Sequence, residues 1–151
     1  MQIIEDDLSG PEIRALLEAN FAGMRANSPK DSCHFLDFEG LNAPGVTFWS
    51  IWDGAALAGC GALRELDVHH GEIKSMRTHV DHLCKGVGTQ MLEHIITQAR
   101  ERGYLRLSLE TGSSEAFVPA IALYSRFGFV GCLPFGDYRD DPFSRFMTLE
   151  L

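Results

Sequence analysis

The sequence predicts an α/β domain built around one mixed β-sheet, with helices packed on the faces of the sheet. Segments rich in β-forming residues alternate with segments of helical periodicity in the order β-α-loop-β-β-β-α-β-α-β-β. A strand, a helix and a second strand also follow one another between Glu72 and Thr111. Such a unit requires a parallel strand pair with a right-handed crossover. We therefore expect a mostly antiparallel sheet that contains one parallel pair.

The first third of the chain predicts a short strand and a long helix. Gln2–Glu5 is the strand, and Ser9-Gly10-Pro11-Glu12 has the pattern of a capping box with proline in the first turn. Apolar residues recur at helical spacing to about Ala26, namely Ile13, Leu16, Leu17, Phe21 and Met24. Residues 27–45 contain prolines and glycines at both ends, so we expect a loop there, with one short helix around Phe35.

The next segment predicts a meander of three antiparallel strands. Val46–Trp52 is rich in β-formers, and Asp53-Gly54 is a strong hairpin signal. Ala55–Leu66 is the return strand, a turn follows at residues 69–71, and Glu72–Thr78 is the third strand.

Helices and strands alternate in the second half. Apolar spacing predicts a helix from about Gly88 to Arg102, and a glycine directly after it provides the stop. Residues 104–111 alternate apolar and polar side chains, which is typical of a strand with one buried face. Residues 119–127 predict a second helix, and residues 129–135 and 146–151 predict the closing strands.

The composition argues against several kinds of partner. The 151 residues include 13 Lys and Arg but 21 Asp and Glu, and the net charge of −8 argues against nucleic acid or an anionic membrane as the main partner. No apolar run is long enough to span a membrane. The four cysteines form no CxxC pair and no signal peptide precedes the fold, so we expect a cytoplasmic protein with reduced thiols. No spacing of histidines and cysteines matches a zinc signature, and we expect no metal.

The best functional clue is the loop Gly86-Val87-Gly88, between the meander and the following helix. Glycine lets the backbone approach an anion, and the first N–H groups of a helix lack partners inside it. The helix dipole adds about half a positive charge at that end. The loop lacks the Gly-Lys-Ser/Thr of a P-loop, so a nucleotide-binding protein is the weakest of the functions considered. Taken alone, these glycines fit a plain turn and helix cap equally well.

A second pattern decides between these interpretations. Ala120–Phe129 has the form Ala-x-x-Leu-Tyr-x-x-x-Gly-Phe, and Glu72–Thr78 runs into Lys85-Gly86-Val87-Gly88. With both stretches in this order, the sequence resembles the GNAT superfamily of acyl-CoA N-acyltransferases. The resemblance covers nearly the whole chain and implies a single GNAT-like domain over residues 1–151, in which the two parallel strands splay apart.

The resemblance implies acetyl-CoA as the co-substrate, lying in the wedge between the splayed strands. Its pyrophosphate would rest on the N–H groups of the glycine loop, and its pantetheine arm would pair with the backbone of the preceding strand like an added strand. The residues implied for acetyl-CoA binding are Met76, Arg77, Thr78, Cys84, Lys85, Gly86, Val87, Gly88 and Thr89.

The resemblance also implies direct transfer of the acetyl group to an amine within a ternary complex. The leaving thiolate takes a proton from a tyrosine, and Tyr124 stands at the matching position. A phenol suits this role because a thiolate is a poor leaving group unless it is protonated or hydrogen-bonded. For the proton of the attacking amine, Glu72 falls where some family members carry a glutamate. Glu110, at the end of the neighbouring strand, and a water molecule are the other candidates.

Three further positions and two segments concern the substrates. His79 ends the strand near the expected active site and could contact the acceptor. Many family members have Asn where Phe117 stands, and Phe117 could instead wall off the acyl end. The family usually has Arg or Gln where Leu83 stands, so the backbone N–H groups should carry most of the pyrophosphate binding. Residues 27–45 and 136–144 should shape the acceptor pocket.

The sequence thus predicts an acetyl-CoA-dependent N-acetyltransferase that acts on a primary amine of a small or amino-acid-like molecule. The alternative is a non-catalytic acyl-CoA-binding module, which would need the same loop. The resemblance also allows for a homodimer, because family members are often dimers.

Overall fold

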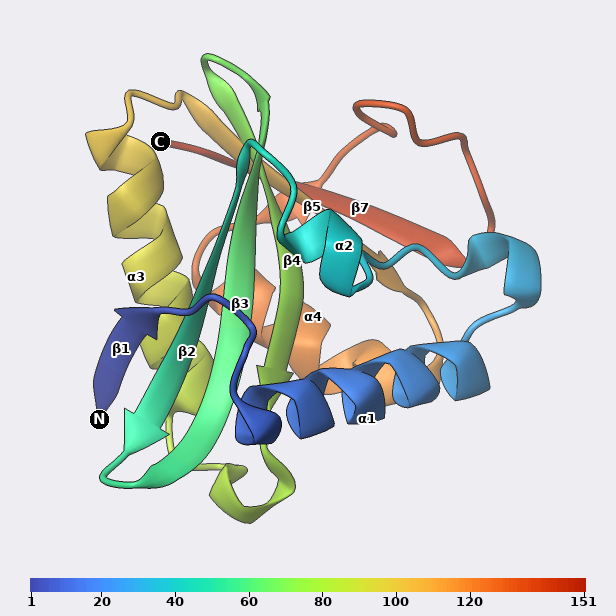
Figure 1. Ribbon diagram of the computed structural model, residues 1–151. Helices are drawn as coiled ribbons and strands as arrows, with labels where there is room; N and C mark the ends of the chain where they lie inside the picture. The colour runs from blue at the N-terminus through green and yellow to red at the C-terminus, as the bar shows by residue number, and fades with distance from the viewer.

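The structure is a computed structural model that describes residues 1–151, and its sheet has seven strands. The strands are β1 (Gln2–Glu5), β2 (Val46–Asp53), β3 (Ala56–Asp67), β4 (His70–Thr78), β5 (Arg106–Gly112), β6 (Val130–Gly131) and β7 (Ser144–Glu150). They lie side by side in the order β1-β2-β3-β4-β5-β7-β6 (Figure 1). Only β4 and β5 pair in parallel, and all other neighbours are antiparallel, which confirms the predicted mixed sheet.

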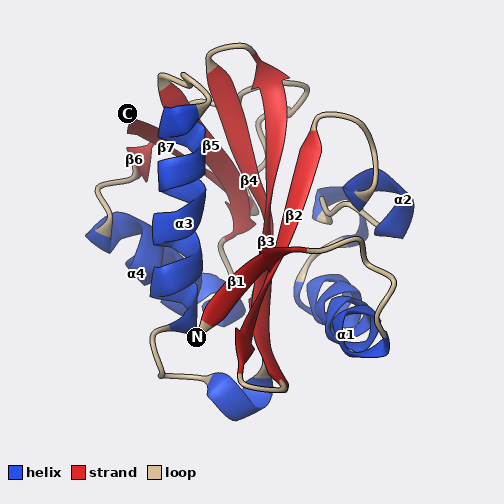
Figure 2. Cartoon of the chain, turned by 60° about the vertical axis from the view of Figure 1, so that its left-hand side comes forward, coloured by secondary structure: helices blue, strands red, loops and turns tan.

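Helices cover both faces of this sheet, as predicted. The α-helices are α1 (Pro11–Asn27), α2 (Phe38–Leu41), α3 (Val87–Glu101) and α4 (Val118–Arg126). Three short 3₁₀ turns are η1 (Lys30–Ser32), η2 (Val80–His82) and η3 (Glu115–Phe117). Figure 2 shows α1 and α2 on one side of the strands and α3 and α4 on the other.

The alternation of side chains along the central strands explains the two layers. In β2, Phe48 packs into the cluster under α1, whereas its neighbour Trp49 packs into the cluster under α3. In β3, Leu57 likewise packs into the cluster under α1 and Ala58 into the cluster under α3. Successive residues of a strand point to opposite faces, so a strand covered on both sides is apolar throughout.

The parallel pair is short. β4 and β5 are paired only over His70–Glu72 and Arg106–Ser108. Beyond this point the two strands separate, and β5 continues to pair with β7 along its other edge. The C-terminal part of β4, residues 74–78, therefore has a strand partner only on the β3 side.

A β-bulge lies in this same part of β4. Ala62 of β3 is opposite Lys74 and Cys60 is opposite Arg77, so that one β3 residue between them faces two residues of β4, Ser75 and Met76. Ser75 has a φ of 57°, in the left-handed region. Bulges bend a strand and redirect its side chains, and they are frequent beside active sites.

Three local predictions were wrong. Ser9 does not cap α1, because its hydroxyl donates to Asp7 at 2.6 Å and Gly10 occupies the cap position without a side-chain bond. No helix forms at Phe35, which lies in the irregular segment between η1 and α2. Its ring stacks on Phe21 of α1 instead. The strand expected over residues 129–135 is only β6, because the chain leaves the sheet after Gly131.

No helix of the protein is both long enough and apolar enough to cross a membrane.

Candidate functional site

The glycine loop forms the N-terminus of α3. Gly86 caps the helix with a φ of 80°, a conformation that favours glycine. The first helical bond runs from Gln90 N–H to the Gly86 carbonyl at 3.0 Å, and the N–H groups of Val87, Gly88 and Thr89 have no protein partner. Three free donors at the positive end of a fifteen-residue helix have the chemistry that favours an anionic group such as a phosphate.

A groove of about 410 Å³ begins at this helix end. Predicted residues of β4 and α3 line it, namely Met76, Arg77, Thr78, Val87 and Gly88. Gly88 lies close to α4, since a β-carbon there would be 3.1 Å from Leu123 Cδ2. Four other predicted residues lie on the adjoining loop and first turn rather than in the groove lining, and they are Cys84, Lys85, Gly86 and Thr89. Leu83 also lines the groove, and it is 55% exposed.

A second, smaller cavity of about 110 Å³ lies where β4 and β5 separate. Tyr124 and Met76 line both this cavity and the groove, so the two spaces adjoin. Glu110 enters it from β5, and Phe117 closes it from η3. The structure thus brings together three residues that the sequence analysis assigned to the reaction or the substrates, Tyr124, Glu110 and Phe117.

Tyr124 is the predicted proton donor, and its environment favours the protonated phenol. The residue is 6% exposed, and its ring packs edge-on against Phe129 at 5.7 Å between centroids. Burial raises the pKa of Tyr124 well above its usual range. The phenol therefore holds its proton at neutral pH and can offer its O–H as a hydrogen-bond and proton donor to a developing thiolate.

Glu110 is half-buried beside the same cavity. Burial raises the pKa of the Glu110 carboxyl, and nearby Glu72 acts in the same direction, whereas Ser144, His34 and Lys74 act against it. A carboxylate whose pKa is raised is a stronger base than an exposed one, which suits it to accept a proton from an amine.

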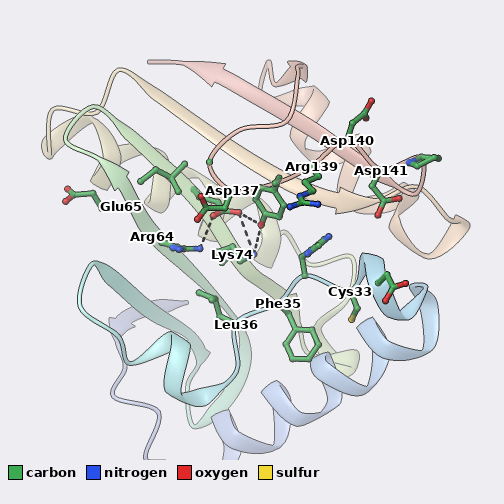
Figure 3. A pocket seen from close by; sticks show the side chains of 17 residues that line it. Cys33, Phe35, Leu36, Arg64, Glu65, Lys74, Asp137, Arg139, Asp140 and Asp141 are labelled. Carbon is green, nitrogen blue, oxygen red and sulfur yellow. Dashed lines mark hydrogen bonds and ion pairs between the residues drawn. The ribbon is translucent and has the colours of Figure 1, made fainter.

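A third space, a pocket of about 750 Å³, lies on the far side of the small cavity (Figure 3). Three distant segments build it: residues 31–36, residues 64–74 of β3 and β4, and residues 136–142 before β7. His34, Phe35 and Lys74 line both this pocket and the small cavity. Groove, cavity and pocket therefore adjoin in this order, and the small cavity is the part that lies between β4 and β5. The two irregular segments predicted to shape the acceptor pocket both line the wide pocket.

Glu72 lies in the floor of the wide pocket and is fully buried. Its Oε2 accepts a hydrogen bond from the Tyr138 hydroxyl at 2.5 Å, and Lys74 Nζ is 3.6 Å from the same oxygen. Arg64 Nη1 lies 3.8 Å from Oε1, which has no hydrogen-bond partner. Figure 3 shows Arg64 and Lys74 reaching this point from neighbouring strands. Glu72 and Tyr124 do not line a common cavity.

His79 lies elsewhere. It lines a separate pocket of about 500 Å³ between α1 and the ends of β3 and β4. Its Nδ1 accepts a hydrogen bond from the N–H of Asp81 at 3.1 Å and so caps η2. Neither the wide pocket nor the small cavity includes His79.

Two residues of the site were not singled out from the sequence. Lys74 lies inside the first motif but has no role in the pattern, and Tyr138 lies in residues 136–144, which were expected as a whole to shape the acceptor pocket without any residue being named. The ring of Tyr138 packs on Phe135 and Phe146, and its hydroxyl accepts a hydrogen bond from Lys74 Nζ at 2.8 Å. Only the folding of residues 136–142 back over β4 brings these two side chains together.

No group of three or more His, Cys, Asp and Glu side chains is arranged to hold a metal ion.

Comparison with known proteins identifies the family. The model of the acetyltransferase (GNAT) family matches residues 11–129. The chain belongs to this family.

Three curated relatives support the assignment to the acetyltransferases. The N-acetyltransferase YsnE of Bacillus subtilis, which is uncharacterized, is 55% identical over 151 residues, covering 100% of both chains. YedL of Escherichia coli, likewise an uncharacterized N-acetyltransferase, is 49% identical and covers 97% of this chain and 92% of its own. An IAA acetyltransferase of Azospirillum brasilense is 37% identical, and the match covers 82% of this chain and 80% of the relative.

Solved structures of GNAT proteins share the fold. A Klebsiella pneumoniae protein classed among the acyl-CoA N-acyltransferases has a TM-score of 0.83 at 29% identity and covers 99% of this chain and 97% of its own. A GNAT acetyltransferase of Elizabethkingia anophelis, solved with acetyl-CoA bound, has a TM-score of 0.70 at 19% identity and covers 99% and 97%. The protein is therefore a GNAT-type acetyltransferase.

Proposed function

We propose that this acetyltransferase moves the acetyl group of acetyl-CoA directly to a primary amine of a small or amino-acid-like molecule, with both substrates bound at once. The observation that carries the proposal is the succession of three adjoining spaces. The groove at α3 suits a CoA arm, the small cavity holds a protonated tyrosine and a carboxylate, and the wide pocket opens beyond them.

The residues present fit acetyl-CoA. The three free N–H groups at the start of α3 offer donors for the pyrophosphate, and the backbone of residues 76–78 has no partner strand on the β5 side for the pantetheine amides. Both features use backbone groups, so neither requires the Arg or Gln that is missing at Leu83.

In the proposed reaction, the neutral amine attacks the thioester carbonyl, a C–N bond forms and the C–S bond breaks. The proton of Tyr124 passes to the leaving sulfur. The proton of the amine passes to a carboxylate, directly or through water, and then to solvent, and solvent returns a proton to Tyr124. We favour Glu110 over Glu72 as that carboxylate, because Glu110 lines the cavity that contains Tyr124 and Glu72 is already held by Tyr138 and Lys74.

The test is a CoA-release assay over a panel of amino acids, polyamines, aminoglycosides and peptide N-termini, run beside calorimetric titration with acetyl-CoA. We expect acetyl-CoA to bind and one class of amine to release CoA with intersecting double-reciprocal plots. Binding without CoA release on any amine would instead support the non-catalytic acyl-CoA-binding module. Parallel plots would contradict direct transfer, since they indicate a covalent acetyl-enzyme.

The cellular location and the oligomeric state of the protein remain predictions. A cytoplasmic location can be checked by fractionation of cells. A homodimer can be checked from the mass in solution by light scattering, which should give twice the 16.8 kDa of the chain.

A further inference from the structure

Lys74 stands at the boundary between the small cavity and the wide pocket and lines both. Its side chain is 9% exposed, which is rare for lysine. It projects from β4 immediately before the bulge, on the side of the wedge opposite Glu110 of β5. A buried ammonium at this position must serve either the fold or a ligand.

The hydrogen bonds of Lys74 leave part of its capacity unused. An ammonium has three donors. One donates to the Tyr138 hydroxyl at 2.8 Å, and Glu72 Oε2 at 3.6 Å is an ion-pair contact beyond hydrogen-bond length. Two donors therefore have no protein acceptor, although the group is nearly buried. Leaving donors of a buried charge unmatched is costly, so an acceptor supplied by a ligand would be strongly favoured.

The charges around the small cavity indicate what that ligand carries. Among the side chains that line it, Lys74 and Glu110 are the fully charged types, and His34 is the one other titratable group besides Tyr124. Because Lys74, Glu110 and Tyr124 line one cavity of about 110 Å³, an acceptor whose amine lies beside Glu110 and Tyr124 would present to Lys74 a group attached next to that amine. An α-carboxylate satisfies this condition, because its two oxygens can accept both free donors of Lys74.

The neighbouring network would keep Lys74 charged and in place. Glu72 offers its carboxylate to Lys74 from below, and the Tyr138 hydroxyl fixes the direction of the first donor while itself donating to Glu72. The wide pocket would then receive the rest of the acceptor, and its volume of about 750 Å³ is large enough for any amino-acid side chain.

We propose that Lys74 binds the carboxylate of the acceptor, and that the acceptor is an amino acid with a free carboxylate adjacent to the amine that is acetylated. This proposal rests on the acetyl transfer proposed above and names the substrate class for the same site. Lys74 is then a residue that determines specificity, and Glu72 and Tyr138 are positioning residues for it.

The experiment compares amino acids with matched molecules that lack the negative charge. L-Leucine and L-phenylalanine are assayed by CoA release beside their decarboxylated amines and their primary amides. We expect kcat/KM for the better acid to exceed that for its amine and its amide by about 10- to 100-fold, the usual effect of a hydrogen bond to a charged group. Spermidine is included because the rim of the wide pocket carries several acidic side chains, including Asp137 and Asp140.

The variant Lys74→Gln tests the residue itself. It should lose this preference, mainly through a higher KM for the acid, while its calorimetric affinity for acetyl-CoA stays that of the wild type. Arg100→Gln is the matched control, because it removes one positive charge from an exposed position of α3 outside all three spaces and should keep the preference.

The outcomes separate the two proposals. If amines, amides or spermidine are acetylated as well as or better than the acids, the carboxylate assignment is overturned and acetyl transfer stands. If no compound of this set or of the wider amine panel releases CoA although acetyl-CoA binds, acetyl transfer itself is overturned. The wild-type comparison decides the matter even where Lys74→Gln fails to fold.

Discussion

At the scale of single residues, Tyr124 combines burial with a position between the groove and the small cavity. We expect Tyr124→Phe to lower kcat by about 100-fold, in the range typical of a lost general acid. The affinity for acetyl-CoA and the melting temperature should change little, because phenylalanine keeps the packing against Phe129. Stopped-flow thiol release and calorimetry provide the two measurements. Unchanged turnover at every pH would remove Tyr124 from the reaction.

The ionisation of Glu110 affects stability and activity in opposite directions. Its protonated form favours the folded state, whereas its deprotonated form would be the catalytic base. Because burial raises its pKa above the ordinary 4.5, the folded protein binds this proton more tightly than the unfolded chain does. Its contribution to stability is thus complete below pH 4.5 and is lost as the pH rises through the folded value. Glutamine carries no such charge, so Glu110→Gln should gain stability relative to wild type between acidic and neutral pH. Urea unfolding at both pH values measures this difference, and a constant difference would contradict the raised pKa.

The same variant tests catalysis when it is paired with Glu72→Gln. Loss of the base should lower kcat/KM about 100-fold in Glu110→Gln with the fold intact. Glu72→Gln leaves Lys74 without its buried counter-charge, and removing one partner of a buried pair costs about 3 kcal/mol of unfolding free energy. A stable Glu72→Gln protein with a specific loss of kcat would instead return the role of base to Glu72.

The sequence was informative about some of these residues and silent about others. Tyr124 and Glu72 stand in motifs, and Glu110 follows from the alternation of a strand, so each could be named in advance. Lys74 and Tyr138 could not, because their roles depend on a contact between positions 64 residues apart. No local pattern encodes that contact, since residues 136–142 have no periodicity and their conformation is fixed by aromatic packing on β7.

At the scale of elements, the start of α3 should bind acetyl-CoA through its backbone. We expect Gly88→Val to weaken binding by about 10- to 100-fold, since its side chain would meet Leu123 and cover the free N–H groups. Leu83→Ala should change the affinity little, although Leu83 borders the groove, because its exposed side chain has no donor to offer. Calorimetry on both variants makes the comparison, and a strong loss from Leu83→Ala alone would contradict it.

The pairing of β3 with the bulged end of β4 depends on a glycine. A β-carbon at Gly59 would lie 2.7 Å from the carbonyl oxygen of Arg77, so one strand must move. We expect Gly59→Ala to lower the free energy of unfolding by about 1–3 kcal/mol and to weaken acetyl-CoA binding as β4 shifts. Gly131→Ala is the matched control, because no atom lies within 4 Å of its β-carbon and a change within about 0.5 kcal/mol is expected. Equal unfolding curves for the two variants would show that β4 tolerates the shift.

Regular elements were the predictable part of the fold. The spacing of apolar residues predicts strands and helices that have a buried face. The predicted order of these elements matches the observed order along the whole chain. The predictions that were wrong concern positions where a tertiary contact outweighs local preference. Phe35 carries a helix-compatible sequence but stacks on Phe21, and Ser9 prefers Asp7 to the helix end. The segment after Gly131 has β-forming residues, yet it leaves the sheet to wall the wide pocket.

At the scale of the whole molecule, the path from the groove through the small cavity to the wide pocket joins segments from both ends of the chain. Residues 31–36 and 136–142 face each other across the wide pocket, and the Ser32 hydroxyl is hydrogen-bonded to the Asp141 carboxylate between them. Acetyl-CoA should order the opposite end of the path. We expect amide exchange in residues 76–78 to slow when acetyl-CoA is added, measured by hydrogen–deuterium exchange. Protection confined to α3, with β4 unchanged, would contradict pairing of the pantetheine arm with the strand.

The three-residue pairing of β4 with β5 bears on whether the sheet can pair with strands of other proteins. Unpaired strand edges on the outside of a sheet invite pairing with foreign strands and lead to aggregation. Here the vacant edge lies in the middle of the sheet, between β3 on one side and the β5–β7 ribbon on the other, with α4 beneath it. The proposed pantetheine arm would pair with this internal edge. The backbone that the co-substrate would use is therefore inside the sheet and belongs to neither of its two outer edges, β1 and β6.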